Sequence, residues 1–167
     1  AGEIEGQDRD GDKLAFLRFE NQYTNLLLLE QPNGDFADTI MRQFLFDAFR
    51  QPMFEKLVHS SDAQLSAIAE KSLKETRYHL KHTSEWIIRL GDGTEESHNR
   101  AQTALDNLWR YTDELFSETG VDLSLVTSGI VPSMVEIKEV WNKTVHAVFA
   151  EATLQIPTNN WQFEGGR

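Results

Sequence analysis

The chain has 167 residues, a usual size for one domain, and is 40% hydrophobic and 26% charged, as ordinary globular proteins are. Its net charge of −11 and its lack of long basic runs exclude a phosphate-tracking stripe, so no nucleic-acid partner is expected. The absence of cysteine excludes disulfides, thiolate metal sites and cysteine nucleophiles, and is consistent with a cytoplasmic protein. The longest apolar run, Leu26 to Leu29, is too short for a membrane span.

The N-terminal part carries acidic residues and turn signals before any long periodic segment. Residues 1–12 are acidic and glycine-rich, which predicts a mobile linker. Short apolar stretches at 14–19 and 26–29 precede the turn sequence at 31–34, and we expect them to pack over a helical bundle. The chain begins without methionine and ends at Gly165-Gly166-Arg167, so we treat it as a possible fragment.

Apolar periodicity predicts two long helices in the first half of the chain. The first begins after Asp35 as N-cap and runs to about Val58. Its apolar stripe consists of Phe36, Ile40, Phe44, Phe54 and Val58. The second helix begins at Ser61, whose spacing to Gln64 fits a capping box, and runs to Leu90 with Gly91 as its C-cap.

Two further helices are predicted in the second half. One is introduced by the Asp92 to Glu95 spacing and stops before Gly120, and an irregular link follows it. The last begins with Ser133 as N-cap and continues to about Leu154. No convincing strand competes, so the pattern predicts an all-α bundle over residues 13–157 and a tail over 158–167.

Asp47 is the first candidate for chemistry, because it falls within the apolar stripe of the first long helix. Burying an unpaired carboxylate costs several kcal/mol, so Asp47 needs a cation, a metal or strong hydrogen-bond donors. A structural salt bridge and a metal site both satisfy this requirement.

Glu75, His79 and His82 share one face of the second predicted helix. Carboxylate and imidazole groups on helices build the di-iron sites of ferritin-like bundles, which use two Glu-x-x-His motifs and two single carboxylates. Here Tyr78 occupies the histidine position of that motif, and His79 comes one residue late. No second Glu-x-x-His occurs, so both histidines are open to packing or ligation.

Four segments of the chain resemble the PaaC family, the structural subunits of phenylacetyl-CoA oxygenase, also called ring-1,2-phenylacetyl-CoA epoxidase. The first runs from Asn25-Leu26-Leu27-Leu28-Leu29-Glu30-Gln31-Pro32-Asn33-Gly34 to Ile40. The others are Lys74-Glu75-Thr76-Arg77-Tyr78-His79-Leu80, Leu108-Trp109-Arg110-Tyr111-Thr112 and Glu151-Ala152-Thr153-Leu154-Gln155-Ile156-Pro157. The resemblance covers nearly the whole chain from about residue 13.

This resemblance implies a ferritin-like bundle that lacks the first two helices of the family fold. It implies a non-catalytic subunit in aerobic phenylacetate degradation, paired with a PaaA-type catalytic subunit that carries the di-iron centre, within a larger complex and with a possible homodimer. No cofactor is then expected in this subunit. The pattern maps Asp47, Glu75, Tyr78 and His79 onto a vestigial metal site, and we expect Asp47 and Glu75 to be neutralised by basic side chains or by protonation.

Two alternatives stay open on the sequence alone. One is an autonomous di-iron or di-manganese carboxylate oxygenase, in which Asp47, Glu75 and a histidine combine with ligands from other helices. The other is a ferritin-like metal protein for storage or electron transfer. Tyr78 in place of histidine argues against both.

Overall fold

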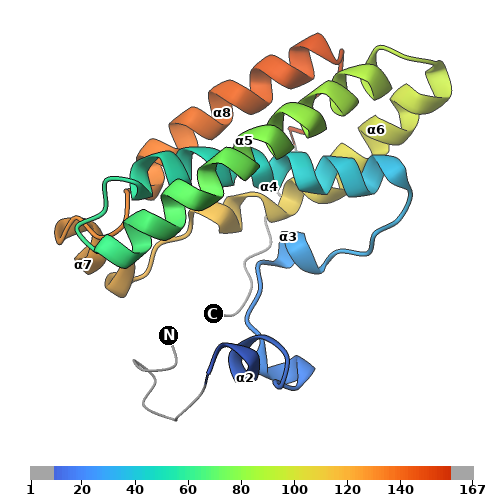
Figure 1. Ribbon diagram of the computed structural model, residues 1–167. Coiled ribbons are helices and arrows are strands. Elements are labelled where there is room, and N and C mark those ends of the chain that lie inside the picture. Colours follow the sequence, from blue (N-terminus) through green and yellow to red (C-terminus); the bar gives the residue numbers. More distant parts are fainter. Residues whose placement is uncertain (1–9, 159–167) are drawn as a thin grey trace.

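The computed structural model describes residues 10–158, and the regular elements in this range are all helices (Figure 1). The long helices are α4 (Phe36–Leu57), α5 (Ala63–Gly91), α6 (Glu95–Leu108) and α8 (Met134–Glu151). The short elements are α2 (Gly11–Ala15), η1 (Glu20–Gln22), α3 (Leu27–Glu30), η2 (Trp109–Tyr111), η3 (Asp113–Phe116) and α7 (Gly120–Thr127). The predicted all-helical bundle is confirmed for the described residues. None of the helices described there is long and apolar enough to cross a membrane.

The helix boundaries agree with the predictions at α4 and α8 and differ at α5 and α6. Asp35 and Ser133 cap α4 and α8 as predicted. Asp62 caps α5 in place of Ser61, because its carboxylate accepts hydrogen bonds from the amides of residues 64 and 65. Thr94 caps α6 in place of Asp92, and α6 ends at Leu108, well before Gly120. Gly91 is the last residue of α5, and Asp92 follows as the C-cap.

The link between α6 and α8 is more regular than predicted, since it contains η2, η3 and α7. The serines of the α4–α5 turn bind the segment that follows α7. The amide of Ser61 donates to the carbonyl of Gly129 at 2.9 Å, and Ser60 Oγ donates to the carbonyl of Ile130 at 2.6 Å. The Ser61 hydroxyl is also directed to this link, since Ser61 Oγ donates to the carbonyl of Ser128 at 3.0 Å.

Helix α4 is the centre of the bundle, because it packs against α5, α6 and α8. The core includes Ile40, Met41, Phe44, Leu45, Leu80, Ile87, Leu105, Trp141, Val145 and Phe149. Trp141 Nε1 of α8 donates a hydrogen bond to the carbonyl of Leu45 in α4 at 3.0 Å. The indole therefore joins these two helices by both packing and a buried hydrogen bond.

Gly91 allows the end of α5 to touch the end of α8. A Cβ at Gly91 would lie 2.1 Å from the carbonyl oxygen of Ala152, a distance that no real side chain tolerates. The carbonyl of Gly91 lies 2.8 Å from His98 Nδ1 and accepts from Thr153 Oγ1 at 3.3 Å. Thr153 has a left-handed backbone, with φ of 58°. The three helix ends therefore meet at a glycine that cannot be replaced without displacement of the backbone.

The N-terminal segments differ from the prediction. Of the predicted linker over 1–12, residues 1–9 lie outside the described part, Asp10 caps helix α2, and residues 11–12 begin that helix. Leu28 of α3 is buried against the bundle as expected. The side chains of Phe16, Leu17 and Phe19 are 78%, 71% and 78% exposed, so that stretch does not pack on the bundle. Of the predicted tail, only residue 158 is described.

Candidate functional site

Asp47 lies in α4 with a fully buried side chain, as the apolar pattern predicts. Its Oδ1 accepts a hydrogen bond from Gln43 Nε2 at 2.9 Å, and Arg50 Nη1 lies 3.6 Å from the same oxygen. Its Oδ2 has no hydrogen-bond partner within the described residues. The carboxylate is therefore only half satisfied, although a buried carboxylate normally needs partners for both oxygens.

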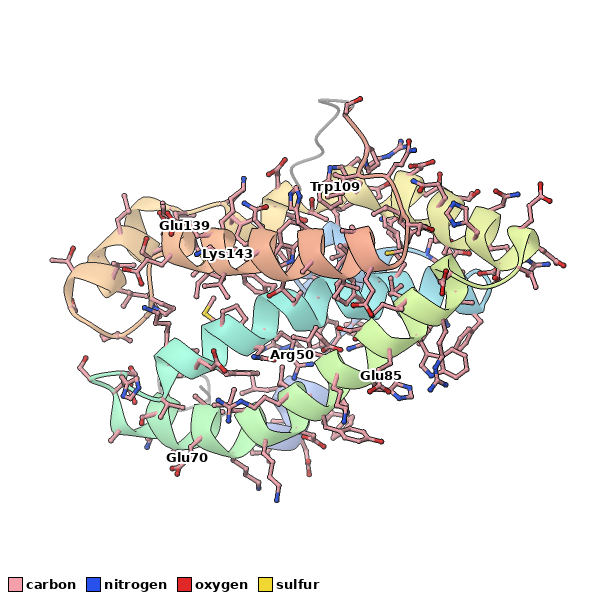
Figure 2. The ribbon with its side chains drawn as sticks, turned by 90° about the horizontal axis from the view of Figure 1, so that it is seen from above. Arg50, Glu70, Glu85, Trp109, Glu139 and Lys143 are labelled. Carbon is pink, nitrogen blue, oxygen red and sulfur yellow. The ribbon has the colours of Figure 1, made fainter. Side chains whose placement is uncertain are left out.

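Arg50 stays close to Asp47 because aromatic rings hold its guanidinium. The guanidinium carbon lies 5.4 Å from the ring centre of Phe46 and 5.5 Å from that of Phe54. Figure 2 shows Arg50 between α4 and α5. At 3.6 Å its contact with Asp47 is an ion pair without hydrogen-bond geometry, so it only partly offsets the burial of the carboxylate.

Burial raises the pKa of Asp47 above its ordinary value of 3.8. The hydrogen bond from Gln43 and the positive charges of Arg50 and His79 act in the opposite direction but are smaller. Arg50 is thus a basic side chain beside Asp47, but the carboxylate is incompletely paired, because Oδ2 has no partner within the described residues.

Glu75 does not join Asp47, and the prediction that it is buried and neutralised is wrong. Its side chain is exposed on α5. The buried face of α5 carries Thr76, Leu80, Thr83 and Ile87, and Glu75 is rotated by roughly 100° from Thr76. The glutamate therefore points away from the α4 contact that encloses Asp47.

The other candidate residues on α5 also differ in how far they lie from Asp47. Tyr78 is 68% exposed, and its ring stacks on His82 at 6.3 Å between ring centres. His79 is half-buried and close enough to lower the pKa of Asp47 by its charge. The structure thus brings His79 toward Asp47 and leaves Glu75, Tyr78 and His82 on the surface.

A di-iron centre does not fit these side chains. Such a site needs several carboxylates and histidines that converge on one point between helices. Within residues 10–158 no group of three or more histidine and acidic side chains could hold a metal ion. Glu75 faces outward, and a tyrosine occupies the position where the motif needs its histidine.

Two residues around Asp47 were missed by the sequence analysis. Gln43 and Arg50 stand four residues before and three residues after Asp47, positions that share its face of the helix. This spacing could have identified both residues, because side chains three and four positions from a buried carboxylate lie beside it on the same helix.

Comparison with known proteins relates the chain to phenylacetate metabolism. A family model described as "Phenylacetic acid catabolic protein" (PaaA_PaaC) matches residues 1–167. The chain is also similar to a 1,2-phenylacetyl-CoA epoxidase subunit of Escherichia coli (strain K12). The two are 44% identical over 167 residues, which are 100% of this chain and 67% of the relative. The chain therefore belongs to the PaaA/PaaC family of phenylacetic acid catabolic proteins.

Proposed function

We propose that this protein is a non-catalytic structural subunit of a phenylacetyl-CoA epoxidase complex in phenylacetate catabolism. Its partner is a PaaA-type subunit that carries the di-iron centre. The identity of 44%, over the whole of this chain, to a relative named as a subunit of that epoxidase supports the assignment. The proposal includes a ferritin-like arrangement of the long helices and a cytoplasmic location.

The arrangement around Asp47 is the structural observation that supports a non-catalytic role most directly. In a di-iron bundle, carboxylates from neighbouring helices point toward one another. Here the carboxylate of α4 is buried beside Gln43 and Arg50, whereas that of Glu75 in α5 is exposed. A guanidinium beside the carboxylate also opposes the binding of a metal cation there.

Exposed apolar side chains support a role in assembly. Phe16, Leu17 and Phe19 lie within four positions and are all more than two-thirds exposed. Exposed apolar clusters of this kind commonly mark protein interfaces. A subunit that is buried against a partner would cover such residues.

The proposal is tested by co-expression of this chain with a PaaA-type catalytic subunit. We expect the two to co-purify, and epoxide formation from phenylacetyl-CoA to require the catalytic subunit, with an electron donor supplied. A preparation of this chain alone that forms the epoxide would establish an autonomous oxygenase. A monodisperse monomer without affinity for the catalytic subunit would also contradict the proposal.

A further inference from the structure

A chemically reactive dipeptide lies in the turn between α3 and α4. Asn33-Gly34 is the one Asn-Gly pair in the sequence, and both residues are exposed to water. The connection that carries them leads from α3 to the start of α4 at the periphery of the molecule (Figure 1). An asparagine followed by glycine is especially open to deamidation, because glycine has no side chain to hinder attack by its own amide nitrogen.

The backbone requires glycine at residue 34. Its φ is 58°, in the left-handed region that favours glycine. A Cβ there would overlap Asp38 Oδ2, which accepts a hydrogen bond from the amide of Asp35 at 2.9 Å and so closes the capping box of α4. A side chain at residue 34 would therefore displace this cap. The fold keeps glycine after Asn33 and, with it, the chemistry of the Asn-Gly pair.

Deamidation of Asn33 proceeds through a cyclic imide. The backbone nitrogen of Gly34 attacks Cγ of Asn33 and forms a C–N bond, the Cγ–Nδ2 bond breaks, and Nδ2 leaves as ammonia with the proton of the attacking amide. Water then opens the succinimide at either carbonyl carbon, which gives aspartate or isoaspartate. The C–N bond forms only when the nitrogen and Cγ approach well inside their van der Waals separation, so the peptide plane and the carboxamide must both move.

Arg42 of α4 holds this turn from one side. Its Nη2 donates to Asn33 Oδ1 at 2.6 Å, and its Nη1 donates to the carbonyl of Gln31 and, at 3.3 Å, to that of Pro32. A guanidinium carries donors only, so the carboxamide presents its oxygen to Arg42. Hydrogen bonds from a charged donor are stronger than those between neutral groups. They fix both the Asn33 side chain and the backbone that precedes it.

Thr39 holds the turn from the other side. Its Oγ1 donates to the backbone carbonyl of Asn33 at 2.8 Å. That carbonyl and the attacking nitrogen of Gly34 belong to the same peptide plane, so the bond from Thr39 resists its rotation. The two reacting groups are therefore each held by a side chain of α4, the carboxamide by Arg42 and the peptide plane by Thr39.

We propose that Asn33 is a deamidation site whose reaction Arg42 and Thr39 suppress in the folded protein. The reaction proceeds from the locally open turn, in which these two side chains have released residues 31–34. Its products carry a new carboxylate two residues before the Asp35 cap, and isoaspartate also lengthens the backbone at the start of α4. This inference is independent of the proposed function, because it concerns only the α3–α4 turn.

The test measures the conversion of Asn33 over time at pH 8, by peptide mapping with mass spectrometry. Wild type is incubated folded and, in parallel, unfolded in urea. We expect the folded protein to convert roughly tenfold or more slowly than the unfolded chain, because local opening must precede ring closure. Arg42→Gln should speed conversion of the folded protein roughly tenfold, since it removes charge-assisted hydrogen bonds that hold the turn closed. Arg42→Lys should fall between the two, because it keeps the charge and loses the planar fork.

Arg100→Gln is the matched control. Arg100 donates to Asp35 at 3.1 Å and to Glu96 at 2.7 Å. Its replacement therefore removes a cation from the same helix start and leaves the bonds to Asn33 in place, so conversion should equal that of wild type. Thr39→Val removes the second bond with little change of shape and should also speed conversion. Circular dichroism checks that each variant is folded, and Thr39→Val decides the test if Arg42→Gln is not.

Three results would overturn the inference. Equal conversion of folded and unfolded wild type would mean that the fold gives no protection. Conversion of the folded Arg42→Gln and Thr39→Val variants at the wild-type rate would mean that the protection does not come from these two side chains. Equal acceleration in Arg42→Gln and Arg100→Gln would assign the effect to the charge at the helix start and not to the bonds with Asn33.

Discussion

The Oδ1 atom of Asp47 accepts a hydrogen bond from Gln43 Nε2 at 2.9 Å, while Oδ2 of the same buried carboxylate has no partner within the described residues. Only one of the two oxygens of this buried carboxylate is hydrogen-bonded by the described residues. An ionised carboxylate in this position is destabilising, because burial removes water that one donor and a distant guanidinium do not replace.

Asp47→Asn should stabilise the protein at pH 7, by about 1 kcal/mol or more. The amide has nearly the same shape and carries no charge to desolvate. The measurement is the free energy of unfolding in urea at pH 7. Asp113→Asn is the control, since it removes a partly exposed ion pair with Lys138 at 2.8 Å and should cost less than about 1 kcal/mol. A loss of stability in Asp47→Asn would show that the carboxylate is well paired.

The stability difference between Asp47→Asn and wild type should depend on pH. The pKa of Asp47 is raised in the folded protein, so the folded state holds this proton to higher pH than the unfolded chain does. The stability that protonation contributes is fully present below the unfolded pKa and is lost as pH rises through the folded pKa. Unfolding curves from pH 3.5 to 8 should therefore show the advantage of the asparagine variant shrinking as pH falls. A constant difference would contradict the raised pKa.

Gln43→Ala should destabilise wild type at pH 7 by about 1–3 kcal/mol, because it removes the only hydrogen bond to the buried carboxylate among the described residues. The cost should be smaller in the Asp47→Asn background, so a double-mutant cycle measures the coupling. Gln51→Ala is the matched control. Gln51 bonds Glu55 at 3.3 Å with the same four-residue spacing, but that acceptor is 39% exposed. Equal costs at both positions would mean that the burial of Asp47 has no energetic effect.

Gly91→Ala should destabilise the fold by about 1–3 kcal/mol, because the new Cβ would overlap the carbonyl oxygen of Ala152. Gly120→Ala provides the comparison, since a Cβ at Gly120 meets nothing within 4 Å. That variant should be neutral or slightly stabilised through the unfolded chain. Thermal unfolding of the two variants should separate them, and similar melting temperatures would contradict the close approach of α5 and α8.

The helical period of the apolar residues was sufficient to predict α4, α5, α6 and α8 and the burial of Asp47. The caps of α5 and α6 were mispredicted, because two residues near each start could serve as cap. At α5 the Ser61 hydroxyl bonds the carbonyl of Ser128, and the Asp62 carboxylate accepts from the first turn of the helix. The exposure of Glu75 was missed because the helical period predicts which residues share a face of the helix. It does not predict which neighbouring helix, if any, covers that face. The surroundings of Gln102 and Arg110 could not be predicted from the sequence, because they include segments more than 50 residues away in the chain.

Metal content tests the central claim most directly. Iron and manganese should be measured by elemental mass spectrometry in this protein purified alone and in its complex with the catalytic subunit. The account predicts far less than one metal ion per chain for the protein alone, and metal in the complex in proportion to the catalytic subunit. Close to two metal ions bound per chain in the protein alone, as in a di-iron bundle, would contradict it.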